Sequence, residues 1–265
     1  MKKFIFRTIK TFCILIVAIL AIFYFVQEKL IFFPQKFNKN YQHTSEINFE
    51  EIQIKTEDFK TLHGLLFKSK ESKGLIFYLH GNAGSIYRSE LVAKTYTDLN
   101  YDVFMLDYRG FGKSDGSIQN QAQIFSDAQL AYNLIKERYS ETKISIMGFS
   151  IGSGIATYLA STNKPNLLIL QAPYLSLTDM MKRRYPYLPT FLLKYKFRTD
   201  RFIKNCSMPI VIFHSTDDLV IPYESSILLR EIIKPTDRLI TLKRAGHNGI
   251  NNNSKFKTEI KNILN

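Results

Sequence analysis

Short apolar runs rich in β-branched residues recur along the chain, and longer amphipathic stretches separate most of them. Apolar runs bounded by turn residues are typical of buried strands, whereas apolar positions repeated every three or four residues are typical of helices. The pattern predicts strands at 47–56, 62–68, 74–79, 101–106, 143–147, 167–171, 209–213 and 238–243. It predicts helices at 85–99, 121–139, 223–234 and 254–264. This alternation favours an α/β fold with a mostly parallel sheet covered by helices on both faces.

One segment breaks this alternation. Residues 173–207 follow a predicted strand directly and contain a Tyr-Pro-Tyr-Leu-Pro run at 185–189. We expect this insertion to form a small cap at one edge of the sheet. A chain of 265 residues with 45% hydrophobic content otherwise fits one large domain with an appendage.

The appendage is N-terminal. Residues 11–27 form a run of 17 residues without a charge, at the short end of the range for a membrane-spanning helix. A cleaved signal peptide is the alternative, but the run is not followed by a small-x-small cleavage pattern. We therefore expect an uncleaved membrane anchor at 1–36 and a main domain at 37–265.

The orientation of this anchor follows from the basic residues that flank it. Four Lys and Arg precede the run and three Lys follow it before residue 40. This small excess favours a cytoplasmic N-terminus, and large domains translocate regardless of their charge. We expect a single-pass membrane protein whose main domain lies outside the cytoplasm. The two distant cysteines are not a disulfide framework, so they do not identify the compartment.

The net charge of +13 raises the question of a nucleic-acid partner. The charge is concentrated in two segments: residues 1–45 carry seven Lys and Arg against one Glu, and residues 174–207 carry eight against two Asp. The rest of the chain is about neutral, and no nucleic-acid motif is present. We therefore expect no nucleic-acid partner. The basic cap segment is either a solvated face or a second contact with the membrane.

The candidate chemistry begins at Gly148-Phe149-Ser150-Ile151-Gly152, which lies between a predicted strand and an apolar helical stretch. A serine on such a sharp strand-to-helix turn is exposed as a nucleophile, and small flanking residues leave room for the turn. The free N–H groups of the following helix point at the position of a developing oxyanion. The alternative is a serine that only caps the helix.

A serine nucleophile needs a base and an acid that orients the base. At this type of turn, the chain order is serine, acid, histidine. His247, after the predicted strand at 238–243, is the expected base. His214, which ends an earlier predicted strand, is expected to shape the loop that presents the acid. Asp218 is the expected acid, and its neighbour Asp217 is expected to bond the turn backbone.

An oxyanion hole needs a second backbone N–H from the loop after an earlier strand. The apolar run at 74–79 is followed at once by His-Gly-Asn-Ala-Gly at 80–84. We assign the two donors to the backbone N–H groups of Asn82 and Ile151. His80 lies upstream of the serine, so it is interpreted as structural.

Together these motifs resemble the α/β-hydrolase superfamily, over the chain from about residue 49 to the end. The resemblance also includes Asp-Tyr-Arg-Gly-Phe-Gly-Lys-Ser at 107–114, interpreted as a structural turn. The N-terminal apolar helix and the aromatic-Pro segment 31–34 are similar to the membrane-anchored abhydrolase domain-containing branch. Ser215 departs from this pattern, since many relatives have glycine after the histidine.

The resemblance implies an α/β-hydrolase fold and a serine hydrolase that uses no cofactor and no metal. The expected substrate is an ester or thioester of an acyl or lipid-like group, cleaved through an acyl-enzyme on Ser150. A peptidase of the same fold is one alternative, although the cap offers only Asp179 and Asp200 to bind an amine. A non-catalytic binding protein on a hydrolase scaffold is the other.

Overall fold

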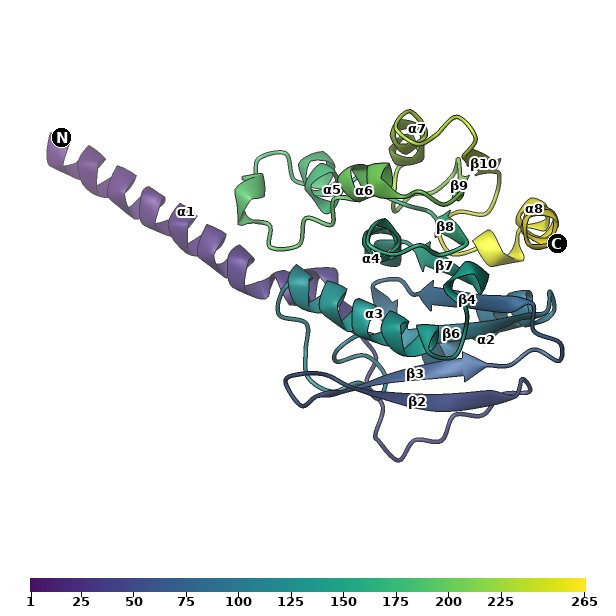
Figure 1. The fold of residues 1–265 in the computed structure, drawn as a ribbon. Helices are drawn as coiled ribbons and strands as arrows, with labels where there is room; N and C mark the ends of the chain where they lie inside the picture. Colours follow the sequence, from purple (N-terminus) through teal and green to yellow (C-terminus); the bar gives the residue numbers. More distant parts are fainter.

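A computed structural model describes the backbone of residues 1–265 and all side chains except that of Arg88. An eight-stranded sheet lies at its centre, in the order β10-β9-β8-β7-β4-β6-β3-β2 (Figure 1). Only the pairs β2–β3 and β3–β6 are antiparallel, so the sheet is mostly parallel. The strands are β2 (Phe49–Lys55), β3 (Thr61–Phe67), β4 (Gly74–Leu79), β6 (Tyr101–Asp107), β7 (Ile144–Phe149), β8 (Leu167–Gln171), β9 (Ile210–Ser215) and β10 (Arg238–Leu242).

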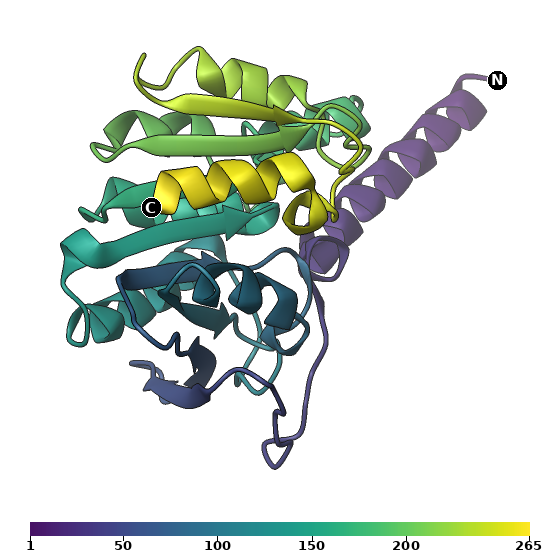
Figure 2. The ribbon, with the colours of Figure 1, turned by 90° about the vertical axis from the view of Figure 1, so that its right-hand side faces the viewer.

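Helices cover both faces of the sheet, as the alternating pattern predicts. The side chains of β4 show why: Leu75, Phe77 and Leu79 pack in one apolar cluster, whereas Ile76 and Tyr78 pack in another. The first cluster is covered by α3 (Gln121–Lys136), α4 (Ile151–Ser161) and α7 (Glu224–Arg230). The second is covered by α2 (Glu90–Thr97) and α8 (Ser254–Leu264), and Figure 2 shows α8 lying across that face.

The segment between β8 and β9 forms the insertion expected at 173–207. It contains α5 (Leu177–Arg184) and α6 (Thr199–Phe202), joined by irregular chain (Figure 1). Short 3-10 turns lie in this segment and elsewhere: η1 (Ile86–Arg88), η2 (Glu141–Lys143), η3 (Thr190–Leu192), η4 (Ile203–Asn205) and η5 (Ile250–Asn252). We refer to residues 173–207 as the cap.

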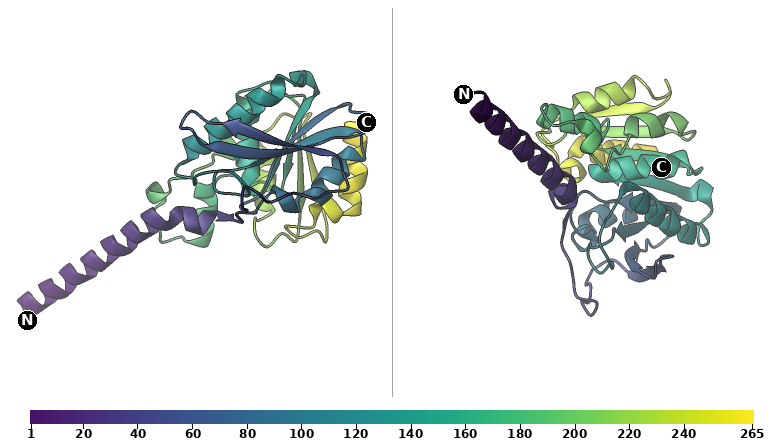
Figure 3. Two further views of the ribbon diagram at one scale, coloured as in Figure 1. Left: turned by 90° about the horizontal axis from the view of Figure 1, so that it is seen from below. Right: turned by 90° about the vertical axis from the view of Figure 1, so that its left-hand side faces the viewer.

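The N-terminal helix α1 (Lys2–Ile31) projects away from the domain (Figures 1 and 3). It extends beyond the apolar run 11–27 at both ends. Its most apolar stretch has a mean hydropathy of 2.6 and no buried residue, so α1 is long and apolar enough to cross a membrane.

A short strand follows α1 and ties it to the domain. β1 (Phe33–Pro34) pairs in parallel with β5 (Ala83–Gly84), in the loop after β4. The preceding Phe32 is 4% exposed and packs edge to face on Tyr195 of the cap. The chain therefore enters the domain beside the loop expected to supply an oxyanion donor.

Candidate active site

Ser150 lies on the turn between β7 and α4, as expected. Its φ of 53° and ψ of −122° form a strained combination for a residue with a side chain, at a cost of about 1–3 kcal/mol. Its backbone N–H donates to the Gln171 carbonyl at 3.0 Å, which holds the turn against β8. The hydroxyl makes no capping bond within the described residues, which argues against a mere helix cap.

The glycines on either side leave the space that this turn needs. A Cβ at Gly148 would lie 2.5 Å from the Gly152 carbonyl oxygen and 2.6 Å from the Ala156 Cβ. A Cβ at Gly152 would overlap the Leu79 carbonyl oxygen. Backbone atoms at the end of β4 therefore approach α4 closely because residue 152 has no side chain.

Three loops bring Ser150, His247 and Asp218 together at one edge of the sheet. The loops follow β7, β10 and β9 respectively. His247 Nε2 lies 3.0 Å from the Ser150 Oγ, and His247 Nδ1 lies 2.7 Å from Asp218 Oδ2. Each side chain is therefore within hydrogen-bond distance of the next.

The Asp218 carboxylate is held by several donors. Its Oδ1 accepts the backbone N–H groups of Val220 at 2.8 Å and Ile221 at 2.9 Å. Burial raises the pKa of Asp218, but hydrogen bonds from His214, His247 and the Ile221 N–H outweigh it, so this pKa lies well below the usual range. Asp218 is therefore ionised at neutral pH and presents a full negative charge to His247.

His214 is buried behind this acid. Its Nε2 lies 3.2 Å from Asp218 Oδ2 and 3.1 Å from the Ile221 carbonyl oxygen, and its Nδ1 lies 2.6 Å from the Ser226 Oγ. Since the carboxylate and the carbonyl only accept hydrogen bonds, Nε2 carries the proton and Ser226 donates to Nδ1. His214 thus braces the Asp218 loop against α7, as the sequence suggested.

Asp217 points elsewhere. Its carboxylate accepts the Ser215 hydroxyl at 2.5 Å, and hydrogen bonds from Ser215 and from the backbone of Gly246 and Ala245 lower its pKa. Asp217 therefore joins the loop after β9 to the loop that holds His247. This is the turn-bonding position that we expected for it.

Asn82 and Ile151 both line the cavity that contains Ser150. The Ile151 N–H is at the first position of α4, where no intrahelical acceptor exists. Two hydrogen bonds hold Asn82 against the end of α1 and the start of β1. Its side-chain Nδ2 donates to the Ile31 carbonyl at 3.0 Å, and its carbonyl accepts the Phe33 N–H at 2.8 Å. The end of α1 thus holds the loop that carries one expected donor.

Two further motif residues have structural contacts. His80 is buried, with its Nδ1 at 2.7 Å from the Gly81 carbonyl oxygen and its ring stacked on Tyr108. Asp107 accepts the Ile86 N–H at 3.0 Å. These contacts agree with the structural roles given to both residues by sequence.

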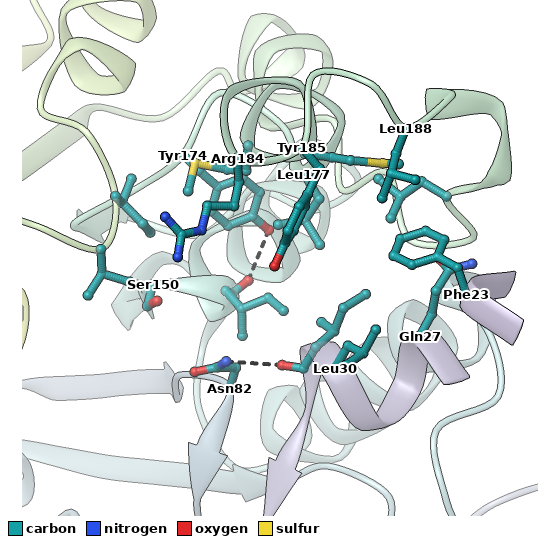
Figure 4. Close-up of a pocket in the computed structure, with 17 residues that line it drawn as sticks. Phe23, Gln27, Leu30, Asn82, Ser150, Tyr174, Leu177, Arg184, Tyr185 and Leu188 are labelled. Carbon is teal, nitrogen blue, oxygen red and sulfur yellow. Dashed lines mark hydrogen bonds between the residues drawn. The ribbon is translucent and has the colours of Figure 1, made fainter. Parts of the chain in front are cut away.

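A cavity of about 440 Å³ opens beside Ser150, within the size range of small-molecule sites (Figure 4). Its wall is mostly apolar and comes from the turn at Ser150, the cap, the Asp218 loop and the last turns of α1. The α1 residues are Phe23, Gln27, Leu30 and Ile31. The sequence pattern predicts this helix only as an anchor, so its contribution to the cavity wall was not expected.

The fold and these motifs match known proteins. A family model described as serine aminopeptidase, S33, matches residues 70–202. Protein bem46 of Schizosaccharomyces pombe is 31% identical over 227 residues, covering 79% of this chain and 76% of that protein. The lysophosphatidylserine lipase ABHD12 of Danio rerio is 33% identical over 177 residues, covering 58% of this chain. The match spans only 46% of that lipase.

A solved structure agrees with the fold. An esterase of Pyrococcus furiosus superposes with a TM-score of 0.71 at 20% identity, covering 88% of this chain and 96% of the esterase. This superposition shows that the chain shares the fold of that esterase. The chain therefore belongs to the α/β-hydrolase superfamily and is a serine hydrolase.

Proposed function

We propose that this protein hydrolyses an ester or thioester of an acyl, lipid-like substrate through an acyl-enzyme on Ser150. The observation that carries the proposal is the hydrogen-bonded series Ser150–His247–Asp218 at the mouth of an apolar cavity. The same three residue types in this order activate serine in unrelated hydrolases.

In the first half-reaction, His247 Nε2 takes the Ser150 proton as Oγ attacks the acyl carbon. The carbonyl electron pair moves to oxygen, and the N–H groups of Asn82 and Ile151 stabilise the resulting oxyanion. The intermediate collapses with loss of the alcohol or thiol, which takes the proton from His247. Water then repeats the sequence on the acyl-enzyme, releasing the carboxylic acid and restoring Ser150.

Asp218 stabilises the imidazolium that forms at His247 in both half-reactions. Its carboxylate is ionised before the reaction begins, since the two loop N–H groups and His214 already satisfy its other lone pairs. Because these donors are in place in the resting protein, no reorganisation is needed when the charge on His247 develops.

The cavity and the helix support a lipid-like substrate. The cavity wall is largely apolar, and α1 offers a membrane anchor for residues 1–36 beside a catalytic domain at 37–265. The cap adds the exposed aromatic residues Tyr187 and Phe191, at 97% and 78%, near its basic residues. Aromatic and basic side chains together favour contact with an anionic bilayer. We place the catalytic domain outside the cytoplasm, on the basis of the flanking charges.

The matched family model is named for an aminopeptidase, so peptide amides are the competing substrates. Binding a substrate amine calls for a carboxylate near the nucleophile. Among the described side chains that line the cavity, the charged one is Arg184. A cation there disfavours an amine and favours an anionic group. Comparing an ester series with peptide amides of matched acyl groups tests this choice.

We expect Arg184 to bind the anionic part of a substrate. Figure 4 shows its guanidinium group directed toward the Ser150 side of the cavity. A hydrogen bond to a charged group contributes about 1.5–3 kcal/mol, and we take the lower end because Arg184 is exposed. Arg184→Gln should therefore raise KM for lysophosphatidylserine by roughly tenfold.

Two controls accompany this measurement. The neutral substrate monoacylglycerol should keep its KM in Arg184→Gln. The neighbouring Arg183 pairs with Asp179 at 2.7 Å, so Arg183→Gln should leave both substrates unaffected. An equal rise in KM for the neutral and anionic substrates would contradict this role for Arg184.

A further inference from the structure

Gln27 is the buried residue of α1, with 1% of its surface exposed. Its Nε2 donates to the Leu192 carbonyl at 2.8 Å, and its Oε1 accepts the Lys194 N–H at 2.9 Å. An amide buried without partners would cost several kcal/mol in an apolar medium, so its two hydrogen bonds matter. The amide nitrogen and the amide oxygen of Gln27 therefore both join the helix to the backbone of the cap.

Neighbouring contacts fix the rotation of α1 about its own axis. The Glu28 carboxylate pairs with Lys194 Nζ at 3.1 Å and accepts the Tyr195 hydroxyl at 2.9 Å. Phe32 packs on the ring of Tyr195. A helix that served only to tether the domain would need no such contacts. The contacts of Glu28 and Phe32 hold one face of α1 against the cap.

That face closes the cavity. Figure 4 shows Ser150 at one end and Phe23 and Leu188 together at the other, with Leu30 and Gln27 along the α1 side. The opposite side of α1 is exposed and apolar, with Phe25 at 73%. An acyl tail that begins at Ser150 would therefore run along α1 toward Phe23 and Leu188.

We propose that α1 is a wall of the acyl-binding site and that the acyl tail of the substrate lies between α1 and the cap. Phe23 then limits the length of the tail, and Gln27 holds the wall closed. This inference rests on the proposed function, because it assumes that the ester lies at Ser150.

If α1 forms this wall, its side chains determine how kcat/KM depends on the length of the acyl chain. Each methylene buried along the cavity should raise kcat/KM about fourfold. The rise should end where the tail meets Phe23. Phe23→Ala removes the ring and should extend the rise to longer tails, whereas Phe23→Trp should end it at shorter ones. Gln27→Leu keeps α1 apolar, removes the two hydrogen bonds of this side chain to the cap and should flatten the profile.

The experiment uses the full chain in lipid nanodiscs with p-nitrophenyl esters from acetate through octanoate and dodecanoate to palmitate. We expect the palmitate-to-octanoate ratio of kcat/KM to rise roughly tenfold in Phe23→Ala and to fall in Phe23→Trp. The matched control is Phe25→Ala, which makes the same change on the exposed face of the same helix. Profiles of both Phe23 variants that overlay the wild-type profile would overturn the inference.

Acetate separates this inference from the proposed function. Its tail is too short to reach α1, so its hydrolysis reports on the catalytic residues and on folding in every variant. If acetate hydrolysis survives Ser150→Ala, the proposed function fails. If acetate hydrolysis depends on Ser150 while the Phe23 variants leave the chain-length profile unchanged, only the role of α1 fails.

Discussion

Ser150→Ala should lower kcat by about 10⁴–10⁶, with the fold intact. The hydroxyl is the atom that His247 faces at 3.0 Å, and no other group of the proposed mechanism can form the acyl-enzyme. The turn should tolerate alanine at this position, because among the described residues the Ser150 Oγ makes no hydrogen bond that caps the helix. Initial rates with a saturating ester, at matched protein concentration, measure the loss.

The matched control is Ser161→Ala, at the other end of α4. Its hydroxyl donates to the Tyr158 carbonyl at 2.7 Å, away from the site, so activity should stay near the wild-type level. The far-ultraviolet circular dichroism of both variants should match the wild type. Activity of Ser150→Ala within tenfold of the wild type would remove Ser150 from the nucleophile role.

Asp218→Asn should lower kcat by about 10³–10⁴. The amide removes the negative charge that stabilises the imidazolium. At the position of Oδ2 its NH₂ group would face both His247 Nδ1 and His214 Nε2 as a donor. At the position of Oδ1 it would face the backbone N–H groups of Val220 and Ile221, which need an acceptor. A donor opposite Nδ1 favours the tautomer of His247 that cannot take the serine proton. Steady-state kinetics on one ester measure the effect.

Asp217→Asn is the paired variant, with the same chemical change one residue earlier. Asp217 bonds Ser215 and the turn backbone rather than His247, so its effect should stay below about tenfold. The reverse ranking would transfer the role of the acid to Asp217 and contradict the geometry of this loop.

Local patterns predicted the sheet well. β4 and β8 begin and end at the predicted residues, because each is a continuous apolar run between turn residues. The helix expected at 85–99 was predicted too long, since α2 begins only at Glu90. Residues 86–88 form the 3-10 turn η1 instead, directly after β5, which pairs with β1 about fifty positions earlier in the chain. Such long-range pairing leaves no trace in a local pattern.

In the candidate site, too, residues within local motifs were predicted, whereas contacts between distant segments were not. Ser150, Asp218 and His247 were predicted because each follows a strand within a short motif, and the structure brings them together because the parallel strands end at one edge. The hydrogen bonds of Gln27 to the cap were not predicted, since its partners lie 165 and 167 residues away in the sequence. One signal was present: a lone amide at the end of an apolar run requires a polar partner.

The most direct test of the account is labelling of the full-length protein with a fluorophosphonate, followed by peptide mass spectrometry. The reagent reacts with a serine only when a base and an oxyanion hole activate it. We predict a single adduct on Ser150, absent in Ser150→Ala and strongly reduced in His247→Ala. A folded wild-type protein that stays unlabelled, or that is labelled elsewhere, would contradict the account and favour a non-catalytic binding protein on a hydrolase scaffold.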